Sequence, residues 1–257
     1  MGKKIQFKSI SLGSDPDVPS ADELASLISD ARGFESDLIT FQMLQSRKYQ
    51  HDSDLDEYGV GGKYATPRMN KALLWDSDNG LIIDTSEIVS DYSMVVRKGG
   101  FIRSVHESPG VLECSPGVND EEGFSELCEG YRKVLRSLRD IGIKSHVILT
   151  KKPDLLELEL ISNTKNTIYL LGPDERELIE LLEFTTKLVI DSQSLSLIPN
   201  LSESYNVRDL VIVDPEEKDL SRVLEFIDIN HVTVAGYARG DEKSYWERLK
   251  SSAEVTL

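Results

Sequence analysis

Short apolar runs recur about every twenty residues in the second half of the chain, separated by polar segments. Four such runs occupy residues 167–171, 187–190, 209–213 and 231–235. Each run has the length of a buried strand rather than that of a helix. Because helix-start signals follow at least three of them, the pattern predicts parallel strands that alternate with covering helices.

The sequence DPEE at residues 214–217 is the strongest helix start in the chain. It offers an acceptor at the N-cap, proline at the first helical position and a carboxylate three residues past the cap. Residues 173–177 and Asp241 repeat this chemistry at two further starts. Apolar side chains then follow at helical spacing and predict one buried stripe; they are Leu220, Val223, Leu224 and Ile227.

Two architectures fit this alternation: an open, doubly wound, mostly parallel sheet with flanking helices, or a closed βα barrel. The number of parallel strands separates them, and residues 154–163 leave that number open because they suit either a strand or a crossover helix. An array of leucine-rich repeats is a third interpretation, since residues 188–201 match its period in part. The regular leucines and asparagines of such repeats are missing from the neighbouring segments.

The first half opens with one more βα unit. A strand is expected at residues 4–12, and the sequence SADE at 20–23 is a capping box that predicts a helix ending at Gly33. Residues 37–43 then resume as a strand.

The amino-acid composition changes after this βα unit. Residues 45–70 are polar and glycine-rich and predict a long loop. Turn signals at 76–80 and 98–100 follow, each between apolar runs, and predict an antiparallel β-meander of four or five strands. We therefore divide the chain into a part with the βαβ unit, loop and meander (1–118) and a βα-repeat part (119–257), or treat both as one continuous domain.

The composition is acidic, because 29 basic residues against 45 carboxylates give a formal net charge of −16. A broad nucleic-acid surface is therefore not expected, since phosphate binding needs Lys and Arg gathered on one face. No apolar run approaches the ~20 residues of a membrane helix, and the start lacks the apolar stretch of a signal peptide. The two cysteines form no disulfide framework, so we expect a cytoplasmic protein. Oligomerisation stays open.

Cofactor motifs are missing from the sequence. No GxGxxG follows the first strand, so neither NAD nor FAD is expected. The sequence GVGGK at 59–63 differs from a phosphate-binding loop, and the histidine and cysteine spacings match no zinc signature. A divalent metal such as Mg²⁺ remains a candidate, because it is bound by carboxylates rather than by a fixed motif.

Candidate site residues follow the predicted strands. In a parallel sheet the carboxyl ends share one edge, where helix N-termini attract anions. The polar residues expected at this edge are Lys151, Lys152, Asp191, Ser192, Asp214 and Arg239. We expect the lysines, Ser192 and Arg239 to bind a phosphate or carboxylate of the substrate. The two aspartates are candidate catalytic residues, as Mg²⁺ ligands or proton carriers. Structural roles compete with these, because Asp214 fits a helix cap and the lysines fit a solvated turn.

A second polar stretch covers residues 103–110. It contains Arg103, a candidate substrate-binding residue, and His106, a candidate catalytic residue, with Cys114 eight residues after the histidine. A Cys-His nucleophilic pair is one interpretation. Strand alternation puts His106 and Glu107 on opposite faces, so both cannot address one substrate unless the strand ends or bulges there.

Two functions fit these features. The first is a soluble enzyme that acts on a small anionic metabolite, bearing phosphate or carboxylate, at the carboxyl edge of a parallel sheet. The second is a non-catalytic interaction or scaffold protein with an acidic surface. A pocket at the edge of the sheet favours the first, and an exposed apolar patch on a flat face favours the second. We favour the enzyme by analogy at the level of the fold.

Overall fold

The computed structural model describes residues 4–17, 20, 37–76, 78–113, 120–152, 154–163 and 165–256. The helix predicted after residues 20–23 and the candidate thiol Cys114 lie outside the described residues. Among the helices that are described, none has both the length and the apolar composition needed to cross a membrane.

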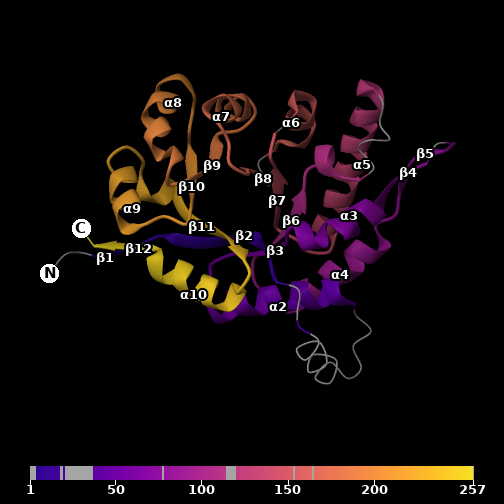
Figure 1. Ribbon diagram of the computed structural model, residues 1–257, viewed down its shortest axis with the longest axis horizontal. Helices are drawn as coiled ribbons and strands as arrows, with labels where there is room; N and C mark the ends of the chain where they lie inside the picture. Colours follow the sequence, from indigo (N-terminus) through magenta and orange to yellow (C-terminus); the bar gives the residue numbers. More distant parts are fainter. Residues whose placement is uncertain are drawn as a thin grey trace.

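Eight parallel strands in the described chain form a closed (βα)8 barrel (Figure 1). They are β2 (Lys8–Asp15), β3 (Tyr58–Gly61), β6 (Ile102–Glu107), β7 (Ser145–Thr150), β8 (Asn166–Leu170), β9 (Lys187–Asp191), β10 (Asp209–Val213) and β11 (Val232–Arg239). Hydrogen bonds join them into two sheets, β3-β6-β7-β8 and β9-β10-β11-β2. The sheets meet where β8 lies beside β9, and where β2 lies beside β3 with a parallel bridge between Ile10 and Glu57. Each strand therefore neighbours the next one along the chain until the ring closes.

Helices surround the strands on the outside of the barrel (Figure 1). They are α2 (Leu38–Asp52), α3 (Thr66–Ala72), α4 (Ser86–Val96), α5 (Glu121–Asp140), α6 (Leu155–Ile161), α7 (Glu175–Leu182), α8 (Ile198–Ser204), α9 (Glu217–Val223) and α10 (Glu242–Ser252). Single turns of 3₁₀-helix add η1 (Lys63–Ala65), η2 (Pro109–Val111), η4 (Ser194–Leu197) and η5 (Ile229–His231). Two antiparallel pairs lie apart from the barrel: the hairpin β4 (Leu73–Asp76) with β5 (Gly80–Ile83), and β1 (Lys4–Gln6) with β12 (Glu254–Thr256).

Side chains alternate along each strand between the barrel interior and the helix layer. On β10, Val211 and Val213 belong to the interior core, whereas Leu210 and Ile212 belong to the larger core between strands and helices. Aliphatic residues of six strands fill the interior, joined by Tyr237. The strands predicted from apolar runs are those buried on both faces, which explains why their sequences show no polar alternation.

The predicted mostly parallel α/β fold is confirmed, and the closed barrel is the architecture observed. The four apolar runs are β8, β9, β10 and β11. Two predicted helix starts also hold: Asp174 accepts a hydrogen bond from Glu177 N at 2.9 Å in a capping box, and Asp241 caps α10. The leucine-rich repeat interpretation was wrong. A single barrel contains strands from both predicted parts of the chain, 1–118 and 119–257, since β2, β3 and β6 precede residue 118 and the other five strands follow it.

Two predictions for residues 37–70 were wrong. Residues 37–43 begin α2 instead of a strand, because Asp37 accepts a hydrogen bond from Thr40 N at 3.1 Å and caps the helix. Residues 45–70 are not a long loop, since they contain the rest of α2, β3, η1 and part of α3. Strand β3 lacks apolar bulk because it packs against β2, where a Cβ on Gly59 would lie 2.4 Å from the Ser11 carbonyl oxygen.

The predicted meander reduces to a single hairpin. Strands β4 and β5 pair as expected around the turn at 76–80, but residues 93–97 end α4 and residues 102–107 form the parallel strand β6. On α4, Ile88, Tyr92 and Val95 lie at helical spacing and are buried. Residues 155–161 form α6, capped by Asp154, which settles the ambiguous segment as a helix.

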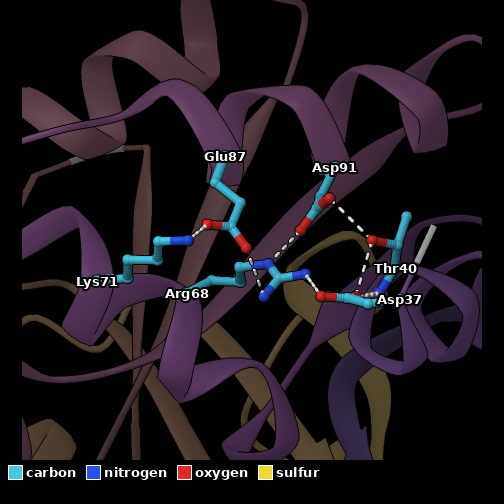
Figure 2. Close-up of polar contacts among 6 residues, drawn as sticks. All are labelled: Asp37, Thr40, Arg68, Lys71, Glu87 and Asp91. Atoms are coloured by element: carbon cyan, nitrogen blue, oxygen red, sulfur yellow. Dashed lines mark hydrogen bonds and ion pairs between the residues drawn. The ribbon is translucent and has the colours of Figure 1, made fainter. Parts of the chain in front are cut away.

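A buried arginine joins three of the covering helices (Figure 2). Arg68 of α3 forms ion pairs with Asp37 at the cap of α2, with Glu87 of α4 at 2.9 Å, and with Asp91 of α4 at 2.5 Å. Thr40 Oγ1 donates a further hydrogen bond to Asp91 at 2.9 Å. The Arg68 and Asp91 side chains are only 8% and 6% exposed, so the buried Asp91 carboxylate depends on Arg68 for charge compensation.

Replacement of Arg68 by alanine is expected to lower the free energy of unfolding by about 3–5 kcal/mol, because the Asp91 carboxylate is left buried without its counter-ion. Urea denaturation measures this change. Arg176→Ala is the matched control, since the Arg176 side chain is 85% exposed and pairs with Glu180 one turn away. Its expected loss is below about 0.5 kcal/mol. Equal losses for the two variants would contradict the assigned role of Arg68.

Candidate active site at the carboxyl end of the barrel

A pocket of about 470 Å³ opens at the carboxyl ends of β8 to β11. The strands contribute Tyr169, Asp191, Tyr237 and Arg239, the loops after them contribute Ser192 and Asp214, and α10 contributes Tyr245 and Arg248. Catalytic sites of (βα)8 barrels form at this end, because the loops that follow the strands converge there. Four residues expected at this edge from the sequence, Asp191, Ser192, Asp214 and Arg239, line the same cavity.

Asp214 lies directly after β10 with a left-handed backbone, at φ 49°. Its Oδ1 accepts a hydrogen bond from the Tyr245 hydroxyl at 2.6 Å. The competing explanation of Asp214 as a helix cap was wrong, since Glu216 and Asp219 form the capping box of α9. Asp214 is therefore available to the pocket. A non-glycine residue held in this conformation stores strain, which the surrounding structure must offset.

The surroundings of Asp214 raise the pKa of its carboxyl group. The protein around the pocket mouth shields the Asp214 carboxyl group from water, and this desolvation raises its pKa. The effect outweighs the Tyr245 hydrogen bond and the nearby Arg248 and Arg239, which lower the pKa. A carboxyl group with a raised pKa is protonated more readily near neutral pH. It is suited to accept and donate a proton.

Two guanidinium groups face this pocket without an ion pair. Arg239 ends β11 and Arg248 lies on α10, and within the described part of the chain neither side chain forms a salt bridge or a hydrogen bond. Arg248 lies over the Tyr245 ring, 5.3 Å from its centroid. In a chain of net charge −16, cations that remain unpaired beside a cavity are available to bind an anionic ligand.

Asp191 is engaged with the turn that follows it. Its Oδ1 accepts hydrogen bonds from the backbone N and the Oγ of Ser194, both at 3.0 Å. Among the residues that the structure describes, no three His, Cys, Asp or Glu side chains gather in a way that would hold a metal ion. The Mg²⁺ role expected for Asp191 and Asp214 therefore stays a prediction.

The structure places the remaining candidates away from this pocket. Lys151 and Lys152 follow β7 and are exposed, but they do not line the cavity. Arg103 lies near the amino end of β6, where it pairs with Glu57 and donates to Thr167 Oγ1 at 3.4 Å. It was expected with the site because residues 101–105 were predicted to be part of a meander.

His106 points out of the barrel. It is 2% exposed and packs edge-on against Tyr92 of α4, with ring centroids 5.5 Å apart. Burial lowers the pKa of His106 to about 3, so the ring is neutral at physiological pH. The neighbouring Glu107 accepts a hydrogen bond from Thr66 Oγ1 at 2.7 Å, on the opposite face of the strand as its position predicts.

Sequence reasoning missed Tyr245 and Arg248. Both lie on the helix correctly expected after Asp241, three residues apart, and therefore on one face of that helix. The ring of Tyr245 packs against that of Trp246 with centroids 4.8 Å apart. The sequence offered one signal, an arginine close to the apolar residues Trp246 and Leu249 of this helix.

Comparisons with known proteins identify the fold. No family model matches the chain, and no curated protein matches its sequence. A B12-independent methionine synthase from Shewanella sp. W3-18-1, in complex with selenomethionine, has a TM-score of 0.65 and 10% identity, covering 97% of this chain and 96% of that one. An O-GlcNAc hydrolase from Thermobaculum terrenum has a TM-score of 0.52 and 9% identity, covering 96% of this chain and 58% of that one. These likenesses show the barrel fold alone.

A buried carboxyl group lies beneath the loop that follows β6. Glu157 of α6 is 1% exposed, and Gly110 N donates a hydrogen bond to its Oε2 at 3.2 Å. Its Oε1 has no hydrogen-bond partner among the described residues. Burial raises the pKa of Glu157 to about 7 from its ordinary 4.5. The barrel therefore favours the neutral form of this side chain.

Because the folded-state pKa of Glu157 exceeds the unfolded value, the stability associated with its neutral form is complete below pH 4.5 and is lost as the pH rises to about 7. Glu157→Gln replaces the ionisable carboxyl group by a neutral amide, so the variant does not lose this stability as the pH rises. We expect the variant to gain up to about 3 kcal/mol relative to the wild type at pH 8, and to gain nothing at pH 4. Urea denaturation at both pH values measures this. Glu159→Gln, at an exposed position of the same helix, should show no such pH-dependent gain.

Replacement of Tyr245 by phenylalanine is expected to raise the pKa of Asp214 further, because the hydroxyl that stabilises the carboxylate is removed. A ¹³C NMR titration of the Asp214 carboxyl group measures this directly. Tyr237→Phe is the control, since the Tyr237 hydroxyl contacts the Ser14 carbonyl oxygen at 3.5 Å instead. An unchanged Asp214 titration in the Tyr245 variant would show that the 2.6 Å contact does not persist in solution.

Proposed function

We propose that this chain is an enzyme that acts on a small metabolite bearing a phosphate or carboxylate group, bound at the carboxyl end of the barrel. The observation that carries the proposal is the meeting in one cavity of Arg239 and Arg248, whose guanidinium groups form no ion pair in the described part of the chain, with Asp214, whose pKa is raised. Its volume of about 470 Å³ is that of a small-molecule site.

The arginines bind the substrate. Guanidinium groups recognise phosphate and carboxylate through paired N–H donors, so Arg239 and Arg248 fix the anionic end of the ligand. Ser192 lies beside them and offers a hydroxyl to the same group. The rings of Tyr169 and Tyr237, with centroids 6.2 Å apart, form an apolar wall that excludes water from the bound ligand.

Asp214 moves the proton in this proposal. Its raised pKa allows the carboxylate to take a proton from the reacting atom and the carboxylic acid to return one. Tyr245 holds the carboxylate in place through the 2.6 Å hydrogen bond. Asp191 orients the loop that carries Ser192, because its Oδ1 accepts hydrogen bonds from Ser194 in that loop.

Fold-level analogy supports the enzyme over the interaction protein. The two structural neighbours described above carry enzyme names, and barrels of this type place their chemistry at the end where the pocket lies. Their substrates carry no weight for this chain at 9–10% identity. The substrate class proposed here rests on Arg239 and Arg248 alone.

A thermal-shift screen with phosphorylated and carboxylated metabolites tests the proposal. Anionic compounds are expected to raise the melting temperature of the wild type. Arg239→Gln and Arg248→Gln should each weaken binding about tenfold or more, because a charge-assisted hydrogen bond is lost. Lys243→Gln is the matched control, since this exposed residue of α10 does not line the pocket.

Chemistry is separated from binding by Asp214→Asn. This variant should bind a stabilising metabolite at least as well as the wild type, because a negative charge is removed beside the anion. It should lose about a hundredfold or more of any turnover found with that metabolite, as expected when a general acid-base group is removed. The proposal fails if no anionic metabolite stabilises the protein, or if both arginine variants bind like Lys243→Gln.

A further inference from the structure

A cavity separate from the candidate active site lies on α2, one of the helices outside the barrel (Figure 1). It has a volume of about 400 Å³ and is lined by side chains of α2 together with Lys98, which follows α4. None of its lining residues also lines the candidate active site. The lining divides into an apolar part and a cationic part.

The apolar part consists of three half-buried side chains of α2: Phe41, Leu44 and Tyr49. Leu44 and Tyr49 also pack against the main core, whereas Phe41 belongs to neither core cluster of the described residues. The Tyr49 hydroxyl accepts a hydrogen bond from Gln45 Nε2 at 2.5 Å, so its polar end already has a partner. The cavity therefore offers apolar surface, in particular the ring of Phe41, to a molecule that enters it.

Helix α2 departs from the usual pattern, in which a helix turns its apolar residues inward. Four of the five residues that it buries are polar, because the buried set is Thr40, Gln42, Met43, Ser46 and Gln50. Phe41 and Leu44 lie outside this set. These apolar side chains line a surface cavity on a helix that uses mainly polar groups for its buried contacts.

The cationic part consists of Arg47, Lys48 and Lys98. Arg47 is held in place, because its Nη2 donates to the carbonyl oxygen of Lys98 at 2.6 Å and to that of Gly99 at 2.8 Å. Its Nη1 makes no hydrogen bond in the described part of the chain. Among the residues that the structure describes, none of these three cations forms a salt bridge, so their charges are available to a ligand.

The charge of this lining is opposite to that of the chain. The protein has 45 carboxylates against 29 basic residues, yet the cavity is lined by three cations and by no carboxylate. Asp52, one turn beyond Lys48 on α2, does not line it. In the candidate active site, by contrast, two arginines accompany two aspartates. A concave surface with charges of one sign concentrates ligands of the other sign.

We propose that the cavity on α2 binds a small amphipathic anion, with an aromatic or aliphatic body and one acidic group. The body packs against Phe41 and Leu44, and the acidic group lies between Lys48 and Lys98 within reach of Arg47 Nη1. A volume of about 400 Å³ suits a ligand of this size. The site goes beyond the proposed function, because it uses none of the residues assigned to catalysis or substrate binding.

The probe is 8-anilinonaphthalene-1-sulfonate, whose rings and sulfonate match the two parts of the cavity. Its fluorescence rises when the rings leave water, so titration of the full chain gives a dissociation constant. Lys48→Gln and Lys98→Gln should each raise this constant about fivefold, because each removes a solvent-exposed charge pair with the ligand. Arg97→Gln is the matched control and should leave it unchanged, since Arg97 is exposed beside Lys98 but does not line the cavity.

Two further measurements test the apolar part and the location. Phe41→Ala should raise the dissociation constant about tenfold, because ring contact is lost. N-phenyl-1-naphthylamine carries the same rings without the sulfonate, so neither lysine variant should change its affinity. In the ¹⁵N-labelled chain, the probe should shift the amide signals of Gln45 and Gly99.

Three outcomes would overturn the proposal. The lysine variants could both bind the probe like Arg97→Gln, or they could weaken the neutral compound as much as the anion. The shifts could also be confined to Ser192 and Gln193, which line the candidate active site. Both lysines are exposed, so the test stays valid if Phe41→Ala disturbs folding. The proposed function is judged separately, since Arg239→Gln should leave binding at α2 unchanged.

Discussion

Parallel packing of each strand against the next, hydrogen-bonded within two four-stranded sheets and closed where the sheets meet, is the constraint on which the rest of this structure depends. The register pairs Val213 with Asp191 on one side and with Ala235 on the other. The last residues of β9 and β10 therefore stand side by side, and β11 extends four residues beyond them. Residues separated by seventy positions, such as Tyr169 and Arg239, meet at one mouth for this reason.

The sequence predicted the strands that carry the apolar core and missed those that do not. Strands β8 to β11 are buried on both faces, so their composition alone marks them. Strand β3 is glycine-rich because β2 approaches it closely at Gly59, and a pattern of side chains cannot reveal a contact made by backbone. The glycines at 99–100 were interpreted as a hairpin turn, whereas Gly99, with φ 76°, follows the end of α4.

The residues of the candidate site could be predicted only where the direction of the preceding strand was predicted correctly. Asp191, Ser192, Asp214 and Arg239 follow apolar runs that were correctly expected to be parallel, and they line one cavity. Arg103 and His106 were placed with them because β6 was expected in a meander. The contributions of Tyr245 and Arg248 depend on how α10 packs across the end of β10, which is a tertiary property that helical periodicity does not encode. Their roles in binding and catalysis remain proposals.

The antiparallel pair of β1 and β12 joins the first and last strands of the described chain. It lies next in sequence to α10, the helix that lines the pocket. Strand β12 follows α10 after a single residue, Ala253, whose carbonyl oxygen accepts from Phe7 N at 2.9 Å. Helix α10 is thereby tethered at its carboxyl end to the residues that lead into β2. Fraying of this antiparallel pair would loosen the helix that presents Arg248 while leaving the eight-stranded ring closed, so the position of Arg248 can change through local opening without global unfolding.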